Sequence, residues 1–167
     1  MAVFLKTTKD HKKHDDYMTP KIAWENIKDY IPKKVIWEAF YGDGSSGSYL
    51  KELGFQVIHD KDDFFENNKG EVVVSNPPFS KTKEVMQRLK ALNKPFILLL
   101  PTGKLITRYV ANLFGDDKLQ IIIPSKRIHF KKFVDGKEVA NWKDDTAFDC
   151  FYYCWKIYLP KDIIWLK

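Results

Sequence analysis

The sequence predicts an α/β fold with a mostly parallel central sheet. Short apolar runs, such as Val72-Val73-Val74 and residues 96–100, recur along the chain and alternate with amphipathic segments. Runs of this length are typical of strands that are buried on both faces and connected by crossover helices. A chain of 167 residues with 44% hydrophobic content is long enough and apolar enough for one globular domain.

The N-terminal half alternates helices and strands up to residue 75. Thr19-Pro20 is a typical helix start, because Thr caps a helix well and Pro suits the first helical position. Gly54 suits the left-handed residue that follows a helix. The expected elements are a helix with Ile22, Ala23, Ile27 and Tyr30, a strand at 35–40, a helix with Tyr49, Leu50 and Leu53, and strands at 55–58 and 71–75.

The alternation continues to residue 123. Ser80 and Thr102 are each placed to cap a helix that follows a strand. The expected elements are a helix with Val85, Met86, Leu89 and Leu92, a strand at 96–100, a helix with Leu105, Ile106, Tyr109, Val110 and Leu113, and a strand at 119–123.

The pattern changes after Pro124. Residues 127–130 have the composition of a strand, and Asp135-Gly136 predicts the turn of a hairpin inserted at about 131–146. Residues 148–158 predict a long aromatic strand that pairs antiparallel near the end of the sheet. We therefore expect about six or seven strands, including this C-terminal hairpin.

The two cysteines, Cys150 and Cys154, are expected to be buried core residues. On one strand they would share a face but lie roughly 13 Å apart, at about 3.3 Å per residue, which is too far for a disulfide. The spacing of cysteines and histidines does not indicate a metal site. Residues 1–16 are polar and predict a mobile N-terminal arm, so the single domain is expected to span 17–167.

The distribution of apolar residues argues against a membrane protein. No apolar run reaches membrane-spanning length, and residues 1–16 lack the apolar stretch of a signal peptide. These two observations predict an intracellular, cytoplasmic protein.

The most informative segment is Asn76-Pro77-Pro78-Phe79, which directly follows an apolar run. Two prolines cannot continue a ladder, so the chain must leave the sheet in a rigid, extended loop. The loop holds two acceptors, the side-chain amide of Asn76 and the carbonyl of Pro77, beside the ring of Phe79. Two acceptors beside a flat ring suit a planar substrate that carries an exocyclic amino group.

A glycine-rich turn follows the strand at 35–40. Glycines at 42, 44 and 47 let the backbone approach a ligand at the carboxyl edge of the sheet, and Glu38 is placed to meet an amino-bearing ligand. Gly-x-Gly-x-x-Gly spacing also occurs in dinucleotide-binding turns, and a purely structural turn is an equal alternative. The carboxylate before the turn, and the absence of a clear acid at the end of an extended second strand, favour S-adenosylmethionine over NAD.

These motifs resemble those of S-adenosylmethionine-dependent amino-methyltransferases. The segment 76–79 resembles the catalytic loop, and 38–44 resembles the loop that holds the cofactor's methionine part, with Glu38 in place of Asp and Ala39 in place of Pro. The order Thr19-Pro20, glycine loop, Asn-Pro-Pro-Phe resembles the gamma-type arrangement of adenine-specific DNA methyltransferases. Small phage and large-DNA-virus families look closest, and their Pro-x-x-Arg-Ile-x-Phe element resembles residues 124–130.

The resemblance implies a compact Rossmann-like methyltransferase fold with an antiparallel C-terminal strand and helices on both faces of the sheet. The segment between Phe65 and Val74 is too short for the extra helix and strand of larger members. Asp60 or Asp62 would meet the cofactor ribose. The implied catalytic residues are Asn76, Pro77, Pro78 and Phe79, and the implied cofactor-binding residues are Tyr17, Thr19, Pro20, Glu38, Ala39, Phe40, Gly42, Gly44, Asp60, Asp63, Phe64 and Asn76.

Basic residues outside these motifs suggest a nucleic-acid partner. The net charge is +6 and the pI is about 9.1, which suits a polyanion but also a solvated basic surface. The chain has no separate target-recognition domain, so specificity would be short or supplied by a homodimer or a partner subunit. The candidate nucleic-acid contacts are Lys81, Lys83, Lys126, Arg127, Lys131 and Lys132.

The expected activity is methyl transfer from S-adenosylmethionine to the amino group of adenine in DNA. An RNA adenine or guanine amino-methyltransferase is the alternative within the class, since the same loop also occurs in enzymes that methylate RNA amines or protein glutamine. A catalytically inactive, cofactor-binding partner subunit and an NAD-binding module are alternatives outside it.

Overall fold

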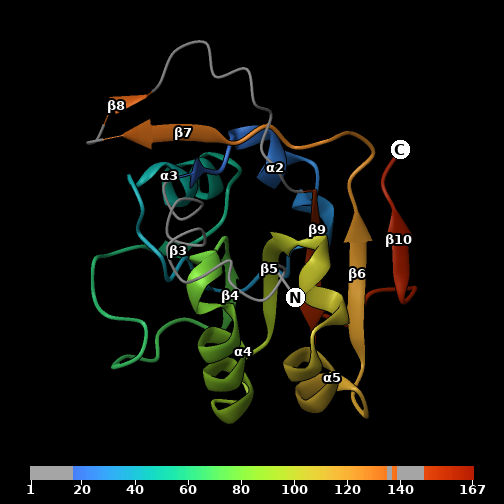
Figure 1. Cartoon of the computed structure of the whole chain (residues 1–167). Coiled ribbons are helices and arrows are strands. Elements are labelled where there is room, and N and C mark those ends of the chain that lie inside the picture. The colour runs from blue at the N-terminus through green and yellow to red at the C-terminus, as the bar shows by residue number, and fades with distance from the viewer. Residues whose placement is uncertain (1–16, 135–136, 139–148) are drawn as a thin grey trace, which may run out of the picture.

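The computed structural model describes residues 17–134, 137–138 and 149–167. Its centre is a seven-stranded sheet in the order β10-β6-β9-β5-β4-β2-β3, and β9 runs antiparallel to both of its neighbours while every other pair is parallel (Figure 1). The predicted α/β class with a mostly parallel sheet is confirmed. The strands are β2 (Ile36–Trp37), β3 (Val57–Ile58), β4 (Val72–Ser75), β5 (Phe96–Pro101), β6 (Leu119–Ile123), β9 (Cys150–Trp155) and β10 (Ile163–Trp165).

Helices cover both faces of this sheet. On one face α2 (Lys21–Glu25) contacts α3 (Ser45–Glu52), and the Tyr152 hydroxyl of β9 donates to the Ala23 carbonyl of α2. On the other face α4 (Thr82–Ala91) contacts α5 (Arg108–Phe114), whose Phe114 ring packs against Trp155 of β9 (Figure 1).

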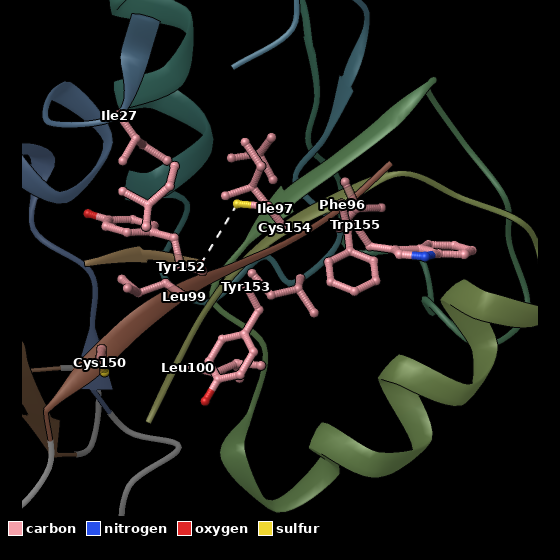
Figure 2. Close-up of a cluster of buried hydrophobic side chains, with 14 of the residues drawn as sticks. Ile27, Phe96, Ile97, Leu99, Leu100, Cys150, Tyr152, Tyr153, Cys154 and Trp155 are labelled. Carbon is pink, nitrogen blue, oxygen red and sulfur yellow. Dashed lines mark hydrogen bonds between the residues drawn. The ribbon is translucent and has the colours of Figure 1, made fainter. Parts of the chain in front are cut away.

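The core is built around β9, whose side chains alternate between the two faces. Figure 2 shows Tyr152 on the side of Ile27, while Tyr153 and Trp155 lie on the opposite side with Phe96. Both tyrosines are fully buried, and their hydroxyls donate to backbone carbonyls. Cys150 and Cys154 are free and buried, which confirms that they are core residues.

The antiparallel orientation of β9 is confirmed, but its place near the end of the sheet is a wrong prediction. Its residue Tyr153 pairs with Leu98 of β5 on one side and Ile121 of β6 on the other. Almost all of β9 is buried, and an internal position gives its backbone hydrogen bonds on both edges. The edge is taken by the short strand β10, which the sequence analysis did not predict.

A second, smaller sheet joins β1 (Tyr17–Met18), β7 (Lys131–Val134) and β8 (Lys137–Glu138), and β7 lies across the carboxyl ends of the main strands (Figure 1). Phe133 pairs with Glu138, as in the hairpin that Asp135-Gly136 predicts. The turn itself, residues 139–148 of the insertion and the predicted arm at 1–16 lie outside the described residues.

The prediction of a strand at 127–130 is wrong. This segment forms no ladder, and the strand begins at Lys131, where pairing with Met18 sets the register. Ile128 and Phe130 are instead buried in the core, so apolar alternation here reflects burial of a loop.

Three predicted caps also differ. Ser80 lies within the 3₁₀ helix η3 (Phe79–Lys81) and Thr102 begins η4 (Thr102–Ile106), so α4 and α5 start later than expected. Prolines at 78 and 101 hold extended backbone immediately before these turns, and a tight 3₁₀ turn redirects the chain into each helix. Pro20, rather than the predicted Thr19, occupies the cap position of α2, and this helix ends before η2 (Lys28–Tyr30). Gly54 adopts the left-handed conformation that was predicted after α3.

Candidate active site at the carboxyl edge of the sheet

A cavity of about 80 Å³ lies where β1, the glycine-rich turn and the Asn-Pro-Pro-Phe loop meet. The three motifs that the sequence analysis singled out therefore contribute to one site. The cavity is lined by Tyr17, Met18, Thr19, Glu38, Phe40, Tyr41, Gly42, Asp43, Ser46, Asn76, Pro77, Pro78 and Phe79.

Strand pairing explains why these segments meet. β2 and β4 are parallel neighbours, with Trp37 opposite Val73, so both strands end at the same edge. The chain emerging from β2 carries Glu38, and the chain emerging from β4 carries Asn76. Ligands of open α/β sheets bind at this edge, outside the carboxyl ends of the strands.

Glu38 is a buried carboxyl group in the lining of the cavity, with 1% of its surface exposed. It accepts hydrogen bonds from the Ser75 hydroxyl and from the Phe40 amide at 3.1 Å. Burial raises the pKa of Glu38 to about 8, although both hydrogen bonds act in the opposite direction. Glu38 is therefore largely protonated at neutral pH, and a cation placed beside it would favour its ionised form.

Asn76 is the first residue of the loop, and of its two side-chain amide atoms only the nitrogen has a described hydrogen-bond partner. The Nδ2 group donates to Thr19 Oγ1 at 2.8 Å. The Oδ1 atom is buried and accepts no hydrogen bond from the part of the chain that the structure describes. Buried polar atoms are nearly always paired, so an orphaned acceptor in a cavity wall indicates a position for a donor from a ligand.

The far end of the loop is fixed by its backbone. The Phe79 carbonyl accepts from the Thr82 hydroxyl at 3.0 Å and from Lys104 Nζ at 3.3 Å. The Phe79 side chain is mostly buried while it lines the cavity, and Pro77 is buried beside it. The loop is thus held at both ends, with Asn76 tied to Thr19 and Phe79 tied to η3–η4.

The residues assigned to the nucleoside end of the cofactor do not line this cavity. Asp60 and Asp62 both pair with Lys69, at 2.7 and 2.5 Å, and the ammonium lowers the pKa of Asp60. Asp63 Oδ1 accepts from the Phe65 amide at 2.7 Å, as in a local turn. Phe64 is buried in the core.

The buried ring of Phe64 packs on Trp37 and Phe40, with centroid distances of 5.4 and 4.9 Å. Ala39 is likewise a buried core residue, and Pro20 lies outside the lining. Gly44 caps α3 with a φ of 87°, while Gly42 lines the cavity with a φ of 57°. Both glycines therefore adopt a conformation that other residues rarely tolerate.

The predicted nucleic-acid residues are distributed around the site. Lys81 and Lys83 are exposed just after the loop, and Lys126 is exposed after β6. Arg127 pairs with Asp149 at 2.7 Å, which partly neutralises it. Lys131 and Lys132 lie on β7, opposite Met18 and Tyr17 of the cavity wall, and their side chains lie outside the described part of the structure.

Sequence reasoning missed Ser75, Met18, Tyr41 and His59. Ser75 is the one polar residue in the run 72–75, which is the signal that could have identified it. His59 stacks on Tyr41 at 4.6 Å, and its Nε2 is a second buried atom without a described partner. The side chain that any other residue would carry at position 47 would collide with the His59 ring, so glycine is required there.

Comparison of the chain with protein-family models and with curated proteins finds no match. Within the ranges that the structure describes, no group of three or more His, Cys, Asp or Glu side chains is placed to hold a metal ion. The helices in those ranges are all too short or too polar to cross a membrane.

Proposed function

We propose that this protein transfers a methyl group from S-adenosylmethionine to the exocyclic amino group of adenine in DNA. The observation that carries the proposal is the buried Oδ1 of Asn76, which has no partner among the described residues and belongs to the lining of the cavity that also contains Glu38. An orphaned acceptor beside an acidic group suits two ligands, one that donates from an amino group and one that carries a cationic amine.

The loop residues account for activation of the adenine nitrogen. Its lone pair is delocalised into the ring, so it is a poor nucleophile. Asn76 Oδ1 and the Pro77 carbonyl accept its two hydrogens, which favours a tetrahedral nitrogen with an available lone pair. Phe79 would stack on the base, an interaction worth roughly 1–3 kcal/mol. The bound cofactor supplies an electrophilic methyl group on a sulfonium, and no strong protein base is required.

Glu38 holds the amine of the cofactor's methionine part. Beside a cationic amine, Glu38 would release to solvent the proton that it carries near neutral pH, and Ser75 would keep the carboxylate oriented by donating to it. Ser75 directly precedes Asn76, so the same short segment orients both the cofactor-side carboxylate and the substrate-side amide.

The fit of the cofactor is limited to its methionine end. None of residues 59–65 lines the cavity, so the adenosine part would extend beyond it. Asp60 and Phe64 are engaged by Lys69 and by the core, so neither is available in this arrangement. Adenosine binding by these residues would require the 59–65 segment to rearrange.

The topology supports the same class of enzyme. An antiparallel strand between two parallel ones, helices on both faces and a site at the carboxyl edge agree with the Rossmann-like methyltransferase fold that the resemblance implies. A DNA substrate would also agree with the net charge of +6.

The decisive experiment is transfer of tritium from labelled S-adenosylmethionine to duplex DNA, single-stranded DNA and RNA, followed by nucleoside digestion. We expect labelled methyladenine in DNA, and none with the Asn76→Ala variant. Label in RNA alone would favour the RNA enzyme. Cofactor binding without transfer to any nucleic acid would refute the proposal and favour a partner subunit, and absence of cofactor binding would favour an NAD-binding module.

A further inference from the structure

The turn after β5 exposes two adjacent apolar side chains. Ile106 is 90% exposed and Leu105 is 39% exposed, and both belong to the 3₁₀ helix η4. The sequence pattern assigned both residues to the apolar face of a helix, but they point away from the core. Ile106 is the most exposed of the large apolar side chains that the structure describes.

This turn is held rigidly by hydrogen bonds. At its start, Tyr153 Oη donates to the Pro101 carbonyl at 2.7 Å and the Thr102 amide donates to the Asp149 carbonyl at 2.8 Å. At its end, the Thr107 hydroxyl donates to the Lys104 carbonyl at 2.6 Å. Ile106 therefore projects from a fixed platform rather than from a loose loop.

The same turn is tied to the catalytic loop. Lys104 Nζ donates to the Phe79 carbonyl at 3.3 Å. β4 and β5 are parallel neighbours, with Ser75 opposite Leu98, so the segments that follow them stand at the same edge of the sheet. The turn that carries Ile106 therefore shares an edge of the sheet with the loop that would receive the target base, and Lys104 links the two.

Charge around the turn identifies the kind of partner. Lys83 and Arg108 line one groove between α4 and α5, and Lys81 is exposed on the neighbouring turn. Glu84 adds one negative charge on the first turn of α4. An apolar projection flanked by cations suits duplex DNA, which presents phosphates outside and apolar base faces inside its stack.

We propose that Ile106, supported by Leu105, enters the base stack of duplex DNA and fills the space left when the target adenine is extruded. The inference rests on the proposed function, because a duplex substrate requires the base to leave the stack before it reaches Asn76. Apolar wedges between base steps are a general means of stabilising unstacked DNA. Lys83 and Arg108 would contact the flanking phosphates.

The test compares the wild type with Ile106→Ala in two assays. The first measures fluorescence anisotropy with a labelled short duplex, either fully paired or with one abasic position. We expect the wild type to prefer the abasic duplex and Ile106→Ala to lose that preference. The second measures methyl transfer, where kcat/KM on duplex DNA should fall by about tenfold or more while single-stranded DNA is affected less than about twofold.

Two control variants distinguish insertion of Ile106 into the base stack, here called the wedge, from general effects of a substitution on the protein. Ile163→Ala removes an isoleucine of β10 that is 51% exposed at the far edge of the sheet, and it should change neither assay. Ile106→Leu should restore most of the duplex activity. Because Ile106 is exposed, both of its variants should keep the wild-type melting temperature.

The outcomes distinguish this inference from the proposed function. Equal losses on duplex and single-stranded DNA, or an abasic preference that survives Ile106→Ala, would overturn the wedge while leaving methyl transfer intact. A wild type that transfers no methyl group but shows an Ile106-dependent abasic preference would refute the activity and support the wedge. A wild type without any abasic preference would overturn the wedge directly.

Discussion

Two amide side chains, one on β6 and one just after β4, have opposite hydrogen-bonding states. Gln120 of β6 uses both ends, since Nε2 donates to the Leu159 and Lys161 carbonyls, each at 3.0 Å, and Oε1 accepts from the Leu159 amide at 2.8 Å. Asn76 uses only its donor, to Thr19, and leaves a buried acceptor without a described partner. Gln120 stabilises a connection, whereas Asn76 retains an acceptor for a ligand.

The contrast extends to Lys94 and Glu38, the buried basic and acidic side chains of the described residues. Lys94 donates to the Gly70 and Lys69 carbonyls at 2.7 and 3.2 Å, at the edge opposite the cavity. Glu38 faces the cavity, and its pKa is raised to about 8 despite two donors. The polar atoms of Gln120 and Lys94 all have partners in the fold, whereas Asn76 Oδ1 at the cavity has none among the described residues.

Replacing Asn76 by Ala should have the largest effect on function. We expect methyl transfer to fall by about 10³-fold, because the variant loses a preorganised acceptor for the reacting amino group. The free energy of unfolding should fall by only about 1 kcal/mol, because the variant loses one hydrogen bond, from Nδ2 to Thr19 Oγ1, while Oδ1 has no partner among the described residues. Transfer assays and urea unfolding measure the two quantities. Asn112→Ala, at an exposed amide of α5, is the matched control, and unchanged transfer by Asn76→Ala would contradict the assignment.

The second prediction concerns the pH dependence of stability at Glu38. The folded protein binds this proton more tightly than the unfolded chain, whose ordinary glutamate pKa is 4.5. Stability should therefore fall as pH rises from about 4.5 to about 8, by about 3 to 5 kcal/mol from this group.

Glu38→Gln should remove that part of the slope, because the amide does not titrate. Urea unfolding across this pH window, in both proteins, measures the difference. Identical slopes in the wild type and the variant would show that Glu38 is ionised throughout.

Replacing Gln120 by Leu should destabilise the fold by about 2 to 3 kcal/mol, because the Leu159 amide and two carbonyls lose their partner inside the protein. Thermal and urea unfolding measure this effect. Methyl transfer below the melting temperature should be unchanged, in contrast to Asn76→Ala. Gln87→Leu, at an exposed position of α4, is the control and should change stability by less than about 0.5 kcal/mol. If Gln120→Leu lost methyl transfer while its stability stayed unchanged, the proposed division between a structural Gln120 and a functional Asn76 would be wrong.

The smallest effect is expected for Ser75→Ala. The hydroxyl donates to Glu38, and this hydrogen bond lowers the carboxyl pKa. Without it the pKa should rise further, so the pH-dependent loss of stability should end at higher pH than in the wild type. The same urea series measures this, together with a loss of about 1 kcal/mol at pH 8 and above. If the pH-dependent loss of stability ended at a lower pH in Ser75→Ala than in the wild type, Ser75 would not stabilise the Glu38 carboxylate.

Local chemistry made several elements predictable. The prolines at 77 and 78 require the chain to leave the sheet after β4, and Gly54 requires a left-handed turn after α3. The same local reasoning failed at 127–130, where apolar alternation reflects a buried loop. It also failed at Leu105 and Ile106, where helical spacing occurs in a turn whose apolar side chains face solvent.

The motifs that form the site could be predicted from the sequence, but the contacts between their side chains could not. Parallel strand order implied that Glu38 and Asn76 would approach each other at one edge of the sheet. The hydrogen bond from Ser75 to Glu38 joins residues 37 positions apart, and no local pattern specifies it. Phe64 shows the reverse case, since a residue in a motif-like position packs into the core instead of lining the cavity.

The sequence by itself determined the alternation of strands and helices, the rigid exit at Asn76-Pro77-Pro78 and the free state of the two cysteines, because each depends on neighbouring residues or on reach along one strand. Only the tertiary structure decided that β9 lies inside the sheet, that Glu38 is buried with a raised pKa and that Asn76 Oδ1 has no described partner. Burial and hydrogen-bond satisfaction depend on which distant segments occupy the surrounding space, and that is settled when the whole chain packs together.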